Sequence, residues 1–434
     1  MKKIISFVLL VLFSGLAVAS VNAQSGRSDI VPEQYIIVFK NSVTNTDNIT
    51  DELRSRHGFE AEMRYSRAIK GFSARLSEDK LEALKNDPRV EFISEDHYVS
   101  IDQARETRQE ARAESNARSN ARGGGAIIIQ SQTTPTGISR IFAESTTNKG
   151  AGVGVAVIDT GIDLTHPDLK TNIASQNKSC IFGKKNANDD NGHGTHVAGT
   201  IAALDNGSGV VGVAPQAKLF AVKVLNKSGG GTWSSVICGI DWVTANAATL
   251  GIKVANMSLG GGGLSDNNCG NSNNDALHKA ICRARDAGVT FVVAAGNSGA
   301  NASSFVPAAY DDAVITVSAL ADSNGIAGGG GPATSYGPDD TFATFSNFGF
   351  VVDIGAPGVS IYSTWKSGGF ATISGTSMAT PHVAGAAALF IKSHPGSTWS
   401  AIRDGLMAAG EALGVGHADP SGLHPEKVLQ ASSL

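Results

Sequence analysis

Runs of consecutive apolar residues recur through the last two-thirds of this 434-residue chain, separated by stretches with helical character. Runs this apolar are typical of strands buried on both faces, and hence of a parallel sheet. The alternation predicts an α/β domain over residues 126–434: a doubly wound, mostly parallel sheet with helices on both faces. The expected strands are 153–158, 219–224, 254–259, 289–295, 314–319 and 351–354, and the expected helices are 195–204, 233–249, 274–287 and 377–392.

Residues 24–102 have a different pattern, which predicts a small separate domain. Residues 35–39 are rich in β-branched and aromatic side chains, and residues 46–57 are helical in character, ending at Gly58. Residues 71–76 alternate like a strand, a second helix follows Ser77, and residues 90–101 return to strand character. The order strand-helix-strand-strand-helix-strand predicts an α+β unit of the ferredoxin-like type.

Residues 103–125 join these two regions. Arg and Glu alternate there with Ala, Asn and Ser, and the stretch ends in three glycines. With no apolar stripe to enter a core, we interpret it as a solvated linker. Exposed linkers are preferred sites of proteolysis, so we expect this one to be cut or removed on maturation.

The first 23 residues have the organisation of a signal peptide. Lys2 and Lys3 precede an apolar run over residues 4–12, and Val21-Asn22-Ala23 is a small-residue cleavage site. The apolar run is shorter than the roughly 20 residues that cross a bilayer, which disfavours a membrane anchor. We therefore expect a secreted, extracellular protein, with any stay in the periplasm limited to transit.

Charge and cysteine content refine this picture. A net charge of -4 gives no reason to expect a nucleic-acid or membrane partner. An even number of cysteines in an exported protein favours disulfides, and the spacings match no zinc signature. Three pairings of the four are open, and we favour Cys269 with Cys282 because that closure is the shortest, which leaves Cys180 with Cys238.

Four polar residues stand out because of where the pattern places them. Asp159 directly follows four apolar residues, where a carboxylate is costly to desolvate unless it is hydrogen-bonded. His193 begins an expected helix and is suited to general base catalysis. Ser377 begins another helix, where backbone dipoles favour a developing anion. Asn297 follows a buried run, and its amide can donate to an oxyanion.

Each of these residues alone also has an ordinary structural interpretation, as a turn residue or a helix N-cap. His196, three residues after His193, raises metal ligation as an alternative. No carboxylate follows at ligand spacing, so we favour a structural role for His196. Taken together, the chain order Asp, His, Ser is the order found in subtilisin.

Two strings carry a specific resemblance: Gly-His-Gly-Thr-His-Val-Ala-Gly-Thr over residues 192–200 and Ser-Gly-Thr-Ser-Met-Ala-Thr-Pro-His over residues 374–382. They resemble the signature motifs of the subtilase family of serine proteases. The resemblance implies a secreted endopeptidase with Ser377 as nucleophile, His193 as general base and Asp159 as the orienting carboxylate. It also implies that Asn297 and the Ser377 N–H form the oxyanion hole. The alternative is a catalytically inactive peptide-binding module on the same fold.

The resemblance further implies substrate, calcium and inhibitor sites. Substrates would pair by main-chain hydrogen bonds, with broad specificity and an apolar or aromatic residue favoured at P1, the residue before the cleaved bond. Residues 24–102 would be a propeptide that inhibits the enzyme and aids its folding, and we expect a monomer. The implied substrate-binding residues are Ser258, Leu259, Gly260, Gly229, Gly230, Ala294, Ala295 and Gly296. The implied ligands of a structural calcium ion are Gln132, Asp168, Leu204, Asn206, Ser208 and Val210.

Overall fold

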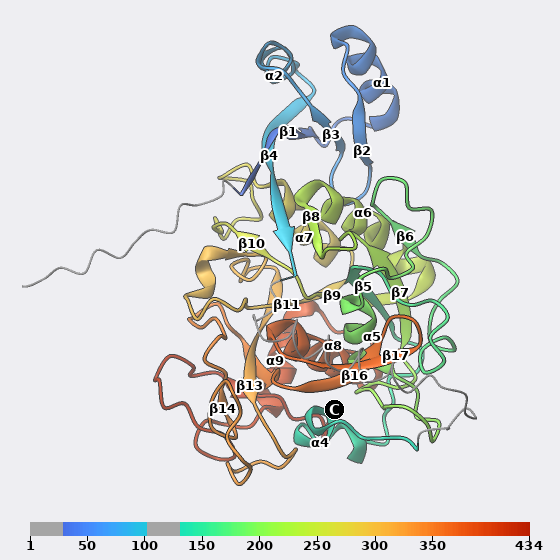
Figure 1. The fold of residues 1–434 in the computed structure, drawn as a ribbon. Coiled ribbons are helices and arrows are strands. Elements are labelled where there is room, and N and C mark those ends of the chain that lie inside the picture. Colours follow the sequence, from blue (N-terminus) through green and yellow to red (C-terminus); the bar gives the residue numbers. More distant parts are fainter. Residues whose placement is uncertain (1–28, 102–130) are drawn as a thin grey trace, which may run out of the picture.

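The computed structural model of this protein describes residues 29–101 and 131–434. The predicted signal peptide and the predicted linker over residues 103–125 therefore lie outside the described residues. The two described ranges correspond to a small domain resting on a larger one (Figure 1). Over these ranges, the structure contains no helix with the length and apolar character needed to span a membrane.

The small domain is the α+β unit that the sequence predicts. Its four strands form an antiparallel sheet in the order β2-β3-β1-β4, and a core of its own includes Phe39, Leu53 and Phe72. Helix α1 begins where Asn45 accepts a hydrogen bond from the Asn48 N–H and ends at Gly58. The elements are β1 (Ile30–Phe39), α1 (Thr46–His57), β2 (Ala61–Tyr65), β3 (Gly71–Arg75), α2 (Glu78–Lys85) and β4 (Val90–Ser100).

The large domain is built on a sheet with strand order β18-β15-β13-β11-β9-β5-β7-β6. All neighbours along this path are parallel, and only β14 joins the sheet antiparallel, beside β13. The predicted doubly wound, mostly parallel fold is therefore confirmed. The strands are β5 (Gly154–Asp159), β6 (Lys178–Ser179), β7 (Lys218–Lys223), β9 (Ile252–Met257), β11 (Thr290–Ala294), β13 (Val314–Ala321), β14 (Thr341–Phe342), β15 (Ile354–Pro357) and β18 (Lys427–Val428).

Helices cover both faces of this sheet. In β5, Val155 and Val157 belong to the core shared with α5 and α8, whereas Ala156 and Ile158 belong to the core shared with α6 and α7. Burial on both faces explains why the strands read as continuous apolar runs. The helices are α5 (His193–Ala202), α6 (Trp233–Leu250), α7 (Ala276–Asp286), α8 (Thr376–Ser393) and α9 (Trp399–Ala409), with the short α4 (Thr136–Arg140) near the start of the domain.

One expected strand lies elsewhere. The apolar run 351–354 precedes β15 and overlaps it only at Ile354, because Val351 and Val352 pack with Ala302 and Ala308 in a separate small cluster. Helix α9 and the hairpin of β16 (Ile361–Trp365) and β17 (Gly369–Ile373) were not anticipated.

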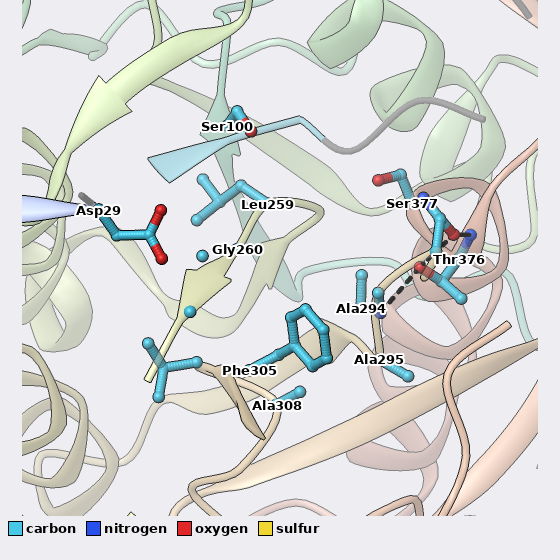
Figure 2. Close-up of a pocket in the computed structure, with 15 residues that line it drawn as sticks. Asp29, Ser100, Leu259, Gly260, Ala294, Ala295, Phe305, Ala308, Thr376 and Ser377 are labelled. Carbon is cyan, nitrogen blue, oxygen red and sulfur yellow. Dashed lines mark hydrogen bonds between the residues drawn. The ribbon is translucent and has the colours of Figure 1, made fainter. Parts of the chain in front are cut away.

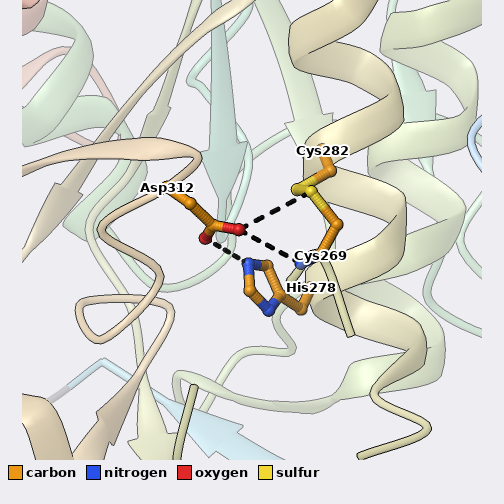
Figure 3. Close-up of side chains that lie close together, drawn as sticks. All are labelled: Cys269, His278, Cys282 and Asp312. Atoms are coloured by element: carbon orange, nitrogen blue, oxygen red, sulfur yellow. Dashed lines mark hydrogen bonds and ion pairs between the residues drawn. A yellow bond between two sulfur atoms is a disulfide. The ribbon is translucent and has the colours of Figure 1, made fainter. Parts of the chain in front are cut away.

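Disulfides join Cys180 to Cys238 and Cys269 to Cys282, the pairing favoured from the sequence. Beside the second disulfide, His278 Nε2 lies 2.6 Å from the carboxylate of Asp312 (Figure 3). The two sulfur atoms are bonded to each other, so this group of side chains is a covalent staple and not a metal site.

Candidate active site

The three candidate catalytic side chains come from three elements that meet at the carboxyl edge of the sheet. Asp159 is the last residue of β5, His193 is the first residue of α5, and Ser377 lies in the first turn of α8. All three are buried. Convergence at this edge is expected for a parallel α/β sheet.

A buried carboxylate holds the imidazole. His193 Nδ1 lies 2.8 Å from Asp159 Oδ1 and 3.0 Å from Oδ2, and both side chains are 0% exposed. Thr160 N–H also donates to Asp159 Oδ1, at 2.6 Å, which offsets part of the cost of burying the charge. With the proton held on Nδ1, the other ring nitrogen is left as the acceptor.

The candidate nucleophile, Ser377, and the candidate base, His193, are not hydrogen-bonded to each other in this state. Ser377 Oγ donates to Ser258 O at 3.2 Å. His193 Nε2 has no hydrogen-bond partner among the described residues. Before its proton can pass to His193 Nε2, the Ser377 hydroxyl must therefore turn away from Ser258 O and towards that nitrogen.

Two N–H donors lie around one point beside the nucleophile. Asn297 Oδ1 accepts from Thr376 N and Oγ1 at 2.8 and 2.9 Å, which fixes the orientation of its amide. A Cβ built on Gly375 would lie 3.4 Å from Asn297 Nδ2 and 3.7 Å from Ser377 N. The glycine thus keeps open a space between the two donors, the arrangement that an oxyanion hole needs.

The last strand of the small domain occupies the cleft. Ser100 N donates to Gly260 O at 3.0 Å, Gly260 N donates to Ser100 O at 3.1 Å, and Ile101 N donates to Gly229 O at 3.0 Å. On the side of Gly229, β4 also pairs antiparallel with β8 (Gly230–Thr232). The structure thus brings together the two expected peptide-binding walls, with an extended chain between them.

A cavity of about 260 Å³ opens beside Ser377 (Figure 2). Five of the expected substrate-binding residues line it: Leu259, Gly260, Ala294, Ala295 and Gly296. Phe305, Val306 and Ala308 also line the cavity and were missed, because only the pairing of β12 (Phe305–Val306) with β10 (Gly261–Gly262) brings them there. No sequence motif signals that pairing.

His196 is not a partner of His193. Its Nε2 lies 2.9 Å from Ile361 O, on the neighbouring hairpin, and burial lowers the pKa of His196 to about 3. It is therefore a neutral, structural histidine, and the metal-binding alternative for this histidine pair has no support in the geometry.

The expected calcium ligands lie around the loop over residues 204–210, which Gln132 and Asp168 contact, and one of them has an unsatisfied oxygen. Asp168 Oδ2 accepts from Val210 N at 2.8 Å, whereas Asp168 Oδ1 is buried with no hydrogen-bond partner among the described residues. Burial raises the pKa of this carboxyl to about 6. An unpaired buried carboxylate oxygen fits a cation at this position.

Two other expected ligands are engaged within the loop. Gln132 Oε1 accepts from the N–H groups of Asn206 and Gly207 at 3.1 and 2.5 Å, and its Nε2 donates to Leu204 O at 3.3 Å. Asn206 Oδ1 accepts from Ser208 N at 3.0 Å. These two side chains must turn before both oxygens face an ion, whereas Asp168 is already in place.

A carboxylate–imidazole pair, a hydroxyl at a helix start and two converging N–H donors define the class of serine peptidases. Comparison of the sequence with known protein families gives the same class. The model of the subtilase family matches residues 150–421, and that of peptidase inhibitor I9 matches residues 34–102. The chain belongs to the subtilase family and is a subtilisin-like serine endopeptidase with an I9-type propeptide domain.

Individual relatives span most of the chain. Subtilisin E of Bacillus subtilis is 35% identical over 416 residues, which cover 94% of this chain and 93% of that protein. Subtilisin DY of Bacillus licheniformis is 44% identical over 290 residues, covering 65% of this chain and 94% of that protein. The crystal structure of a cold-adapted subtilisin-like serine proteinase is 37% identical with a TM-score of 0.54, covering 66% of this chain and 91% of that chain.

Proposed function

We propose that Asp159, His193 and Ser377 are the catalytic triad of this endopeptidase. Ser377 Oγ attacks the carbonyl carbon of the scissile bond while His193 Nε2 takes its proton. Asp159 holds the Nδ1 proton and stabilises the imidazolium that forms. The observation that carries the proposal is the contact of 2.8 Å between two fully buried side chains, His193 Nδ1 and Asp159 Oδ1.

The oxygen of the attacked carbonyl becomes an anion, which accepts hydrogen bonds from Asn297 Nδ2 and Ser377 N. The tetrahedral intermediate then collapses and expels the amine, to which imidazolium gives its proton. The acyl group remains on Ser377 Oγ. A water molecule, deprotonated by His193 in its turn, hydrolyses this ester and restores the enzyme.

The small domain acts as an intramolecular inhibitor in this proposal. Residues 98–101 of this domain are hydrogen-bonded to both peptide-binding walls. No substrate strand therefore has access to the walls until the small domain leaves. Contacts at its base also support a folding role: Asp241, on α6, accepts from Arg67 N and Ala68 N at 2.6 and 2.8 Å. We assign residues 24–102 to the propeptide, 103–125 to the linker and 126–434 to the mature domain.

The walls of the cavity beside Ser377 support an apolar P1 residue, because Ala294, Ala295 and Gly296 carry no charge. We also propose that the mature domain binds a structural calcium ion beside Asp168. The ion would compensate the buried charge of the Asp168 carboxylate and would take no part in the reaction.

We further propose that the protein is exported with cleavage of residues 1–23, and that the enzyme is a monomer.

The test is Ser377→Ala in the full-length precursor. We expect it to abolish both hydrolysis of a protein substrate and self-processing, while Ser421→Ala, at an exposed serine, retains both. Labelling of the unaltered protein by a fluorophosphonate at Ser377 is the companion measurement. Self-processing by the alanine variant would refute the proposal, and activity without labelling would favour another nucleophile. Inertness of the unaltered protein towards substrate and reagent alike would favour the inactive binding module.

A further inference from the structure

A fully buried lysine lies on the strand next to that of Asp159. Lys223 is the last residue of β7 and the single charged residue in the apolar run over residues 219–225. The pairing of β5 with β7 places it opposite Asp159, and its side chain is 0% exposed. A buried ammonium group is costly unless its donors are hydrogen-bonded. The acceptors around Lys223 therefore indicate what its charge does at this end of the sheet.

All three N–H donors of the Lys223 ammonium group are used. Its Nζ donates to Thr160 O at 2.6 Å, to Asp190 Oδ1 at 2.7 Å and to Leu225 O at 2.9 Å. An ammonium group has three donors, so none remains for a substrate. Lys223 can therefore act on the reaction only through the segments that it holds.

Two of the three bonds hold the backbone around the carboxylate. Thr160 follows Asp159 in the chain, and its N–H donates to Asp159 Oδ1 at 2.6 Å. The Thr160 hydroxyl also accepts from Gly194 N at 2.9 Å, in the first turn of α5. Leu225 N donates to Asp159 O at 3.2 Å. A shift of the ammonium group would therefore move residues that contact Asp159 from both sides.

The third bond holds the loop that leads to the imidazole. Asp190 lies three residues before His193, and its Oδ2 lies 3.0 Å from Lys184 Nζ, on a side chain that is 51% exposed. Burial by itself would raise the pKa of the Asp190 carboxyl, but hydrogen bonds from Lys223 and Lys184 hold it below its ordinary value. Exposed ion pairs contribute little, so the buried lysine is the stronger anchor of the Asp190 side chain.

We infer that Lys223 is a positioning residue for catalysis, which joins the segment of Asp159 to the loop of His193 and keeps the carboxylate within hydrogen-bond distance of the imidazole. The inference rests on the proposed function, because it concerns two members of the proposed triad. Catalytic groups must be held in a precise geometry, and a misplacement of about 1 Å can cost about 100-fold in rate. The link is a polar contact between three segments, which an apolar side chain at position 223 could not make.

The experiment compares the mature forms of the unaltered enzyme, Lys223→Met, Asp190→Ala and the double variant on one peptide anilide. Fluorophosphonate labelling counts the active sites, so kcat is expressed per folded enzyme. We expect Lys223→Met to lower kcat about 10- to 100-fold with KM little changed, and Asp190→Ala to lower kcat as well. Lys218→Met, at an exposed lysine that begins the same strand, is the matched control and should keep the parent kcat.

The double variant tests whether the two residues act as one link. We expect it to be about as slow as Lys223→Met alone, because residues that share one interaction are not additive. The loop keeps other anchors, since Asp189 Oδ1 accepts from Asn191 N and Gly192 N at 2.8 and 3.0 Å. Should Lys223→Met nevertheless fail to fold, Asp190→Ala alone decides: a lowered kcat supports the inference and an unchanged one overturns it.

An unchanged kcat in Lys223→Met would overturn the inference, even with a lowered Tm, because the lysine would then serve stability alone. A loss confined to KM, or losses that multiply in the double variant, would also overturn it. Labelling separates these results from failure of the proposed function. An unaltered enzyme that is neither labelled nor active refutes the triad, whereas a labelled Lys223→Met with the parent kcat refutes only the role of Lys223.

Discussion

Ser100 of the propeptide and Gly260 of the catalytic domain exchange both of their backbone hydrogen bonds, at 3.0 and 3.1 Å. Such doubly bonded pairs recur every two residues along an antiparallel ladder. A substrate strand that keeps this register therefore pairs with Ser258 two residues later. The carbonyl oxygen of Ser258 is the atom to which Ser377 Oγ donates, so this is the point at which a peptide bond meets the nucleophile.

In the numbering of the precursor, that register predicts a first cut between residues 102 and 103. The match to the inhibitor family also ends at residue 102. Presentation within one molecule supplies a high effective concentration, so this bond need not carry a favoured P1 residue. Amino-terminal sequencing of the earliest large product should find Gln103. A first product beginning after the glycines at 123–125 would contradict the register.

Asn297→Ala tests the oxyanion donors. We expect kcat to fall about 10²- to 10³-fold, the loss known for the corresponding amide in subtilisin itself, with KM little changed, because the amide donates to charge that exists only in the transition state. Steady-state kinetics on a single peptide anilide substrate measures kcat and KM separately and so checks this expectation. Asn186→Ala, at an exposed asparagine, is the matched control. An equal rise in KM would indicate a role in substrate binding instead.

Chelation tests the calcium loop. The sample is the Ser377→Ala precursor, which does not digest itself. We expect EDTA to lower its Tm and added calcium to restore it. An ion that binds only the folded state stabilises that state by about 2.7 kcal/mol when its free concentration is 100 times its Kd. Asp168→Asn should remove most of the calcium response, since the buried Oδ1 loses its charge. Asp286→Asn, whose side chain is 64% exposed, should respond like the parent. An undiminished response in Asp168→Asn would place the ion elsewhere.

A buried histidine predicts a specific pH dependence of stability. Burial lowers the pKa of His382 from 6.5 to about 4, so between these values the unfolded chain binds a proton that the folded protein does not. The free energy of unfolding should therefore fall as pH decreases through this range, by up to about 1.4 kcal/mol per pH unit from this residue. The contribution is fully retained above pH 6.5.

Urea unfolding of the Ser377→Ala precursor at pH 4.5, 5.5 and 6.5 measures the slope. His382→Gln should reduce this slope but not abolish it, because the buried His196 contributes in the same direction. The substitution also lowers stability at every pH. His394→Gln, on an exposed ring, should leave the slope unchanged. If the free energies of unfolding of the parent and of His382→Gln changed in parallel with pH, His382 would not be the residue that takes up the proton on unfolding.

The sequence by itself determined the class of fold and singled out the side chains that we propose as catalytic. Strands such as β5 lie between two helical layers, so their apolar runs are visible without coordinates. Asp159, His193 and Ser377 each lie at an element boundary, where a polar residue contrasts with its apolar neighbours. The disulfide pairing was favoured on loop length, although three pairings remained open.

Tertiary structure alone decided the size of the substrate pocket and the state of the nucleophile. Phe305 enters the pocket through the pairing of β12 with β10, two short strands more than 40 positions apart in the chain, and no local pattern encodes that contact. The hydrogen bond from Ser377 Oγ to Ser258 O likewise joins residues far apart in sequence. Local periodicity reports which residues are buried, whereas the shape of a cleft depends on which distant surfaces face each other across it.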